Sequence, residues 1–91
     1  MITSAPDDSS ILHRAHALIH GQREEDYAPP KVNFQRIATV WSILLGIDIT
    51  PEQVAAMMVG LKLCRLANDV NHEDTWMDIA GYVGCWERLR E

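Results

Sequence analysis

The feature that most constrains the fold is the segment Pro51–Leu61, which is apolar on nearly every face when it is drawn as a helix. A helix that is apolar all round normally lies inside a structure rather than on its surface. Thr50 precedes the segment as a capping residue, Pro51 takes the first helical position and Gln53 the third, a combination typical of a helix start. The sequence therefore predicts a central helix that begins at Pro51 and ends near Asn68.

Three other segments repeat apolar residues at the spacing of an amphipathic helix. Ser9 or Ser10 is placed to cap the first of them, and Gly21 is suited to a left-handed cap at its end. Gly46 is placed to end the second, and Asn71 to begin the last. No segment alternates as a strand does, so the sequence predicts an all-α fold, a compact bundle of about four helices. The expected ranges are about 9–21, 31–45, 51–68 and 72–90.

The core is predicted from the apolar stripes of these helices. Trp41 and Trp76 are expected as anchors of the core or of an interface. His16 and His20 are four residues apart, a spacing that metal ligands can use, but no carboxylate of their helix completes a set. We therefore expect both histidines to be exposed. The stripes are Ile11, Leu12, Ala15, Leu18 and Ile19 in the first helix, Phe34, Ile37, Ala38, Trp41, Leu44 and Leu45 in the second, and Trp76, Ile79, Ala80 and Val83 in the last, with a second stripe of Asp78, Tyr82, Cys85 and Leu89.

A chain of 91 residues is expected to form one domain, 1–91, with residues 1–8 as a loosely ordered lead. Its apolar fraction of 47%, with three Trp and four Met, is high for this length. We interpret the excess as contact between subunits and expect a homo-oligomer. Gly81 and Gly84 in the last helix indicate close approach of another helix, for example across a dimer axis. Cys64 and Cys85 have apolar neighbours and are expected as buried free thiols.

The charge balance disfavours nucleic acid as a partner. The net charge is -5 and the sequence has no run of Lys and Arg, so binding to a phosphate backbone is unfavourable. No signal peptide, membrane-spanning run or lipidation signal is present. We therefore expect no membrane partner and a cytoplasmic location.

A polar constellation follows the central helix. Lys62 and Arg65 lie three residues apart and so share one face of it, and the next segment is acidic. The two cations could bind phosphate, Arg65 with its bidentate fork and Lys62 as a point charge. Alternatively, they pair with Asp74, Asp78 or Asp69 across the turn between the helices. Both interpretations stay open from the sequence.

Four motifs together resemble a family of small phage and prophage proteins known only as a domain of unknown function. The resemblance covers roughly residues 12–90, and it implies a phage protein acting in the cytoplasm of an infected or lysogenic bacterium. In that family the first motif usually reads Asp-Tyr-Gly-His-Pro, and here Ala28 and Pro29 replace the glycine and the histidine. Asn33, Asp26 and Tyr27 belong to these motifs, but they could equally be capping and turn residues. The motifs are Asp26-Tyr27-x-x-Pro30, Asn33-Phe34-x-Arg36-Ile37-Ala38-x-x-Trp41, Lys62-x-x-Arg65-Leu66 and Asp78-Ile79-Ala80-Gly81-Tyr82.

The chain is also distantly similar to the MazG-like all-α nucleoside triphosphate pyrophosphohydrolases. Those enzymes hold magnesium against a triphosphate with carboxylates from two facing helices, which suits the preference of Mg²⁺ for oxygen ligands. Here Asp74 and Asp78, four residues apart, are the candidate metal ligands. The central helix has Met57 and Leu61 where that family carries acid. Mg²⁺ is therefore expected only if this alternative holds.

The function expected from the sequence is binding of a nucleotide or another phosphate-bearing small molecule without turnover, in order to sequester or sense it. No catalytic residue is assigned. One alternative is the magnesium-dependent pyrophosphohydrolase. The other is a structural or protein-interaction module, in which Lys62, Arg65 and Asp78 form a closed ion-pair network with no pocket beside it. The candidate ligand-binding residues are Lys62, Arg65, Asp78, Tyr82, Asn33, Asp26 and Tyr27.

Overall fold

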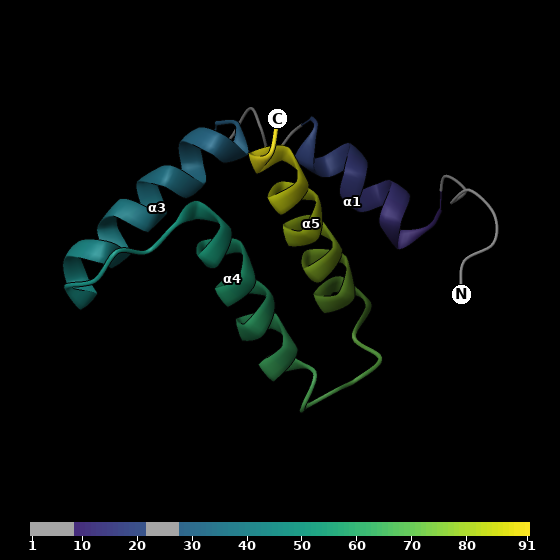
Figure 1. Cartoon of the computed structure of the whole chain (residues 1–91). Helices are drawn as coiled ribbons and strands as arrows, with labels where there is room; N and C mark the ends of the chain where they lie inside the picture. Colours follow the sequence, from purple (N-terminus) through teal and green to yellow (C-terminus); the bar gives the residue numbers. More distant parts are fainter. Residues whose placement is uncertain (1–8, 22–27) are drawn as a thin grey trace.

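The computed structural model describes residues 9–21 and 28–91, and in these ranges every regular element is an α-helix (Figure 1). The described part of the chain contains no strand, which confirms the predicted all-α fold. None of the helices in this part combines the length and the apolar character that a membrane span needs. The helices are α1 (Ile11–Ile19), α3 (Pro30–Leu45), α4 (Pro51–Arg65) and α5 (Glu73–Leu89).

The helix at the centre of the bundle is α5, which packs against α1, α3 and α4. In Figure 1, α4 and α5 lie side by side with α1 on the other side of α5, and α3 crosses near the start of α4. The prediction that Pro51–Leu61 is the central, all-round buried segment is therefore wrong. Only Val54 and Ala55 of α4 are fully buried, because α4 has neighbours on one side only.

The start of α4 is the boundary that the sequence predicts best. The Thr50 hydroxyl accepts a hydrogen bond from the Gln53 N–H at 3.2 Å, and the Gln53 side chain accepts one from the Thr50 N–H at 2.9 Å. This reciprocal capping box satisfies two backbone donors that have no partner inside the helix. The helix ends earlier than predicted, at Arg65 instead of Asn68. After Arg65 the backbone hydrogen bonds join residues three apart instead of four, and the Asn68 N–H, for example, donates to the Arg65 carbonyl.

Two of the other predicted caps are confirmed and two are wrong. Ser10 caps α1 by accepting from the His13 N–H, as predicted. Gly46 ends α3 at φ 71°, in the left-handed region that glycine adopts without cost. His20 rather than Gly21 is the C-cap of α1, and Gly46 is the only described glycine with positive φ. The side chain of His72, not Asn71, caps α5 by accepting from the N–H of the third helical residue.

The core lies where α3, α4 and α5 meet and where α1 closes over α5. Gly84 faces Ile19, and a Cβ added at Gly84 would overlap the Ile19 Cδ1 atom. The predicted close approach at this glycine is therefore explained by α1 of the same chain, without a dimer axis. The buried apolar residues are Ala15, Ile19, Phe34, Ala38, Val54, Ala55 and Cys85, with Ile37, Trp41, Ile49, Met58, Tyr82 and Leu89 packed partly buried against them.

Several residues predicted as core are exposed. Leu44 and Leu45 lie at the surface, and Leu44 shares the outer face of α3 with the exposed Val40 and Ile43. Trp76 is also exposed, although its indole N–H donates to the Val70 carbonyl at 2.7 Å. Both cysteines are free as predicted, but Cys64 is exposed and only Cys85 is buried.

The loop before α3 contains a strained residue. Ala28 has φ 72°, and it is the only described residue other than glycine with positive φ. A side chain in this region costs about 1–2 kcal/mol because its Cβ crowds the following carbonyl oxygen. This is the position at which the resembled phage loop pattern carries glycine. Ala28 therefore keeps a backbone conformation that is better suited to glycine.

Candidate functional site

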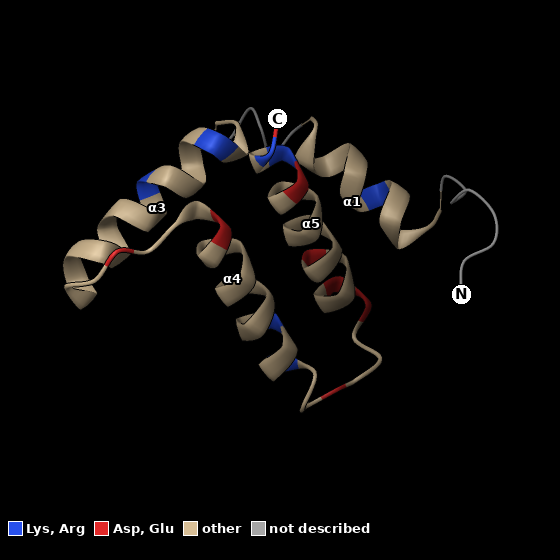
Figure 2. Cartoon of the chain, in the orientation of Figure 1, with Lys and Arg blue, Asp and Glu red and all other residues tan. Residues whose placement is uncertain are grey.

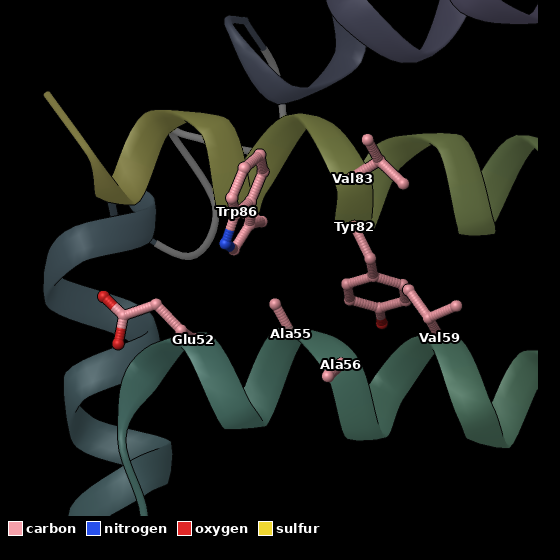
Figure 3. A pocket seen from close by; sticks show the side chains of 7 residues that line it. All are labelled: Glu52, Ala55, Ala56, Val59, Tyr82, Val83 and Trp86. Carbon is pink, nitrogen blue, oxygen red and sulfur yellow. The ribbon is translucent and has the colours of Figure 1, made fainter.

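A mainly apolar groove with a volume of about 320 Å³ lies between α4 and α5 (Figure 3). We call it the α4–α5 groove. Its size lies at the lower end of the range for small-molecule sites. The residues that line it are Glu52, Ala55, Ala56 and Val59 of α4 and Tyr82, Val83 and Trp86 of α5.

The two helices contribute different kinds of side chain to this groove. Figure 3 shows the Tyr82 ring directed from α5 toward α4 and the Trp86 indole lying against α5, while Ala55 and Ala56 on α4 are small. The groove exists because small residues stand opposite large aromatic ones. The Tyr82 ring also lies near the Phe34 ring, with 6.4 Å between centroids, so the core holds it from behind.

Trp86 forms the more open end of the groove. Trp86 is 40% exposed, and the Arg90 guanidinium lies 5.0 Å from the ring centroid. This cation–π contact covers part of one ring face and fixes the indole on α5. Glu52 stands at the same end, and its carboxylate points away from the aromatic rings in Figure 3. The Tyr82 and Trp86 rings therefore line an apolar part of the groove, and the Glu52 carboxylate lies at its edge.

An ion pair lies beyond the other end of the groove. Lys62 Nζ is 3.0 Å from Asp78 Oδ2, and the Lys62 side chain is only 14% exposed. Lys62 follows Val59 by three residues and Asp78 precedes Tyr82 by four, so the pair is about one helical turn past the groove. The structure thus brings Lys62, Asp78 and Tyr82 to one side of the α4–α5 contact. It also shows Lys62 paired with Asp78, the structural alternative that the sequence left open.

Arg65 does not join this pair. It is exposed at the last residue of α4, and within the described ranges it has no ion-pair partner. Figure 2 shows both cations near the C-terminal end of α4, across from the acidic half of α5. A cation here is favourable for the helix dipole, which explains its presence without a ligand. Because its guanidinium has no ion-pair partner in the described ranges, Arg65 is the cation on this side of the molecule that could bind an anion.

Three other candidate residues are not brought to the groove. Asn33 is half-buried in the first turn of α3 and is not among the residues that line the groove. Asp26 and Tyr27 lie outside the described residues, so their predicted role has no structural account.

The predicted magnesium ligands do not fit a metal site. Asp74 is exposed near the start of α5, and Asp78 is engaged by Lys62. In the part of the chain that the structure describes, no group of three or more His, Cys, Asp and Glu side chains could hold a metal ion. Magnesium in all-α pyrophosphohydrolases needs carboxylates from two facing helices, and here α4 turns Ala56, Val59 and Lys62 toward α5 instead.

Sequence reasoning missed most of the residues that line the groove. Trp86 was not singled out, although it follows Tyr82 by four residues and so lies on the same face of α5. Ala55 and Ala56 were treated only as part of an apolar helix. The sequence does contain a signal for the groove: one helix has a face of small residues and the next has a face of aromatic residues. This signal indicates a groove only when the two helices are known to be neighbours.

The fold and the site define a small all-α protein with an aromatic groove between two neighbouring helices and an exposed arginine beyond it. The chain belongs to the family described as a domain of unknown function (DUF6378), which it matches over residues 10–90. This confirms the resemblance to a family known as a domain of unknown function, and the description names no activity.

Two phage proteins are similar over most of the chain. The Gene 55 protein of Mycobacterium phage L5 is 46% identical over 82 residues, which cover 89% of this chain and 53% of the relative. The Gene 55 protein of Mycobacterium phage D29 is 42% identical over 82 residues, covering 90% and 54%. The chain thus spans about half the length of the curated relatives it matches. No solved structure matches it.

Proposed function

We propose that the α4–α5 groove binds a nucleotide or another small molecule that combines an aromatic body with a phosphate, without turning it over. The observation that carries the proposal is an aromatic-lined groove of about 320 Å³ with a cation further along α4, Arg65, whose guanidinium has no ion-pair partner within the described residues. A phage protein of this kind would sequester or sense a ligand in the cytoplasm of its bacterial host.

The groove suits the aromatic part of such a ligand. Trp86 and Tyr82 present ring surface, and a base that stacks on an aromatic side chain gains roughly 1–3 kcal/mol. On the α4 side of the groove Ala56 is exposed and small, whereas Ala55 is buried in the core. The exposed Ala56 leaves the ring surface of α5 accessible, which supports the proposal.

The charges favour Arg65 over Lys62 as the residue that meets the phosphate. Lys62 is held by Asp78, so a phosphate would have to compete with a carboxylate for it. Arg65 meets no such competition within the described ranges and offers two parallel donors. It lies six residues beyond Val59, about 9 Å along the helix axis, which is close to the span from a base to its phosphates. Arg65 is therefore the expected phosphate ligand, and Lys62 contributes through its charge.

The chemistry of the described residues supports binding without turnover. Hydrolysis of a triphosphate in this structural class depends on a metal held by several carboxylates. Asp74 and Asp78 are the two carboxylates of α5 that the sequence suggests for this purpose, and Asp78 is already paired. The groove itself contains a single carboxylate, that of Glu52, at its far rim.

Isothermal titration calorimetry with mono-, di- and cyclic nucleotides, with and without magnesium, tests the proposal. Arg65→Met should weaken binding more than Lys62→Met, and Trp86→Ala should weaken it by removing the stacking surface. Lys31→Met is the matched control, because Lys31 is exposed on α3 and donates to the Glu91 carbonyl away from the groove. His16→Gln with His20→Gln should also leave binding unchanged.

The outcomes separate the three candidate functions. Binding that falls with salt and with loss of Arg65 supports the proposal, since a net-acidic protein attracts an anion only through local cations. Binding and release of pyrophosphate only in the presence of magnesium would replace it with the pyrophosphohydrolase. If no nucleotide binds below millimolar concentration in either condition, the chain is a structural or protein-interaction module.

A further inference from the structure

We propose that α3 pairs with α3 of a second copy of this chain, antiparallel about a twofold axis near Ser42. The observation behind this proposal is a second apolar surface on α3, separate from the one that packs against α4 and α5. We call it the outer α3 stripe. It consists of Val40, Ile43, Leu44 and Ile47.

The outer α3 stripe has the spacing of a helix–helix contact. Val40, Ile43 and Leu44 are separated by three and four residues and so lie on one face. Ile47 follows the end of the helix, and it borders the same surface hollow of about 340 Å³ as Ile43. Ile43 is 76% exposed and Leu44 is 74% exposed. The opposite face of α3, with Phe34 and Ala38, is already buried in the core, so the helix has two apolar faces and only one of them has a partner.

Charge favours a second copy as the occupant. The sequence has no charged residue from Ile37 to Ile47, although the chain carries a net charge of -5. In Figure 2 the blue segments of α3 lie in its N-terminal half, and red appears only after its end. Identical acidic molecules repel each other, and an uncharged surface is the one that they can bring together.

The residues that flank the stripe also fix the direction of pairing. Arg36 is exposed four residues before Val40 and so lies on the same face, and Asp48 borders the hollow with Ile43. A twofold axis near Ser42 sets Arg36 opposite Asp48 of the second copy, once on each side. The same register sets Val40 opposite Leu44 of the second copy. A parallel pairing would instead place like charges together.

The area of the stripe sets the expected strength. Its four side chains expose on the order of 400–500 Å², against about 800 Å² per partner in a standard interface. Two copies would thus bury roughly 1,000 Å² in all, which is typical of the weaker specific complexes. We therefore expect a dissociation constant in the micromolar range. The stripe shares no residue with the groove lining, which belongs to α4 and α5, so dimer formation does not depend on the proposed ligand.

Sedimentation velocity at concentrations from about 1 to 200 µM tests the pairing. The unmodified chain should change from 10.3 kDa monomers to dimers across this range. Leu44→Glu should raise the dissociation constant by more than 100-fold. Leu63→Glu is the matched control, because Leu63 is an exposed leucine at the far end of α4. Circular dichroism checks that each variant stays helical, as expected for exposed positions.

A charge exchange tests the antiparallel register. Arg36→Glu or Asp48→Arg alone should weaken the dimer about tenfold, because each turns two attractive pairs into repulsive ones. The double variant Arg36→Glu/Asp48→Arg should restore the original constant. A monomer at 200 µM, a dimer that survives Leu44→Glu, or a double variant as weak as the single ones would overturn the proposal.

Discussion

The contact between Gly84 and Ile19 allows the packing of α1 on α5 to be tested by a substitution whose sign is not obvious. In an exposed helix, Gly→Ala stabilises by about 1 kcal/mol, because alanine loses less backbone entropy on folding. At Gly84 the added methyl group would overlap the Ile19 Cδ1 atom. Overpacking of this kind typically costs about 1–3 kcal/mol. Gly84→Ala should therefore destabilise the fold by roughly 0–2 kcal/mol in spite of its better helix propensity.

The cause can be isolated by removing the overlapping atom. Ile19→Val deletes the Cδ1 methyl group and alone should cost about 0.5–1.5 kcal/mol. In the double variant the nearest remaining contact corresponds to the Ile19 Cγ1 position, 3.7 Å from the new Cβ, which is ordinary van der Waals distance. The stabilisation that alanine gives at position 84 through its better helix propensity is then no longer offset by the overlap. The double variant should thus be more stable than the sum of the single changes by about 1–2 kcal/mol, a coupling that is measurable between residues in contact.

Urea unfolding followed by circular dichroism, at one fixed protein concentration, measures these free energies. Gly60→Ala is the matched control, because Gly60 lies within α4 and has no heavy atom within 4 Å of an added Cβ. It should stabilise by about 1 kcal/mol. If Gly84→Ala stabilises as much as Gly60→Ala, or if the double variant shows no coupling, the close packing of α1 on α5 is refuted.

Three further stability predictions use the same measurement. Ala28→Gly should stabilise by about 0.5–1 kcal/mol, because the relief of positive φ exceeds the added freedom of the unfolded chain; no gain would mean that Ala28 is not strained. Thr50→Ala removes the N-cap acceptor and should cost about 1 kcal/mol, whereas an unchanged midpoint would contradict the capping box. Asp78→Asn should cost about 1–2 kcal/mol by leaving the largely buried Lys62 cation unpaired, and Lys62→Met in the same chain should recover most of it. Failure of that rescue would show that the pair is not structural.

The sequence predicted the features that depend on neighbouring residues along the chain. The Thr50 capping box, the Ser10 cap and the left-handed Gly46 are local, and the structure contains all three. Asn71 failed as a cap because His72, one residue later, offers a ring nitrogen with the same reach. Competition between adjacent polar residues is decided by small differences in backbone geometry. Boundaries of this kind are therefore predictable only to within a few residues.

The arrangement of the helices was harder to predict, because it depends on residues that are far apart in the chain. The apolar character of α4 suggested a central helix, but α5 is central because Gly84 admits Ile19 on one side while Cys85 and Tyr82 face the core. Leu44 was assigned to the core because it continues a regular stripe. A stripe shows which face of a helix is apolar, but not how far the partner helix extends along it.

The candidate site shows the same division. The pairing of Lys62 with Asp78 was one of the alternatives read from the sequence, since both residues flank the α4–α5 turn. The α4–α5 groove was not foreseen, because Ala55 and Trp86 each look like ordinary core residues. A groove forms where small side chains on one helix face large ones on the next. Which side chains face each other is known only when the relative position of the two helices is known.

The groove and the ion pair are connected through the spacing between α4 and α5. Small residues such as Ala55 would let two helices close on each other, which would remove the space between them. The helices are instead held at two levels: Val54 and Cys85 pack in the core near one end, and Lys62 bonds Asp78 beyond the other. Between these levels Tyr82 and Trp86 of α5 and Ala56 and Val59 of α4 line the groove. The Lys62–Asp78 pair ties α4 to α5 about one helical turn beyond the groove, and it leaves Arg65 as the cation at this end of α4 without an ion-pair partner in the described ranges.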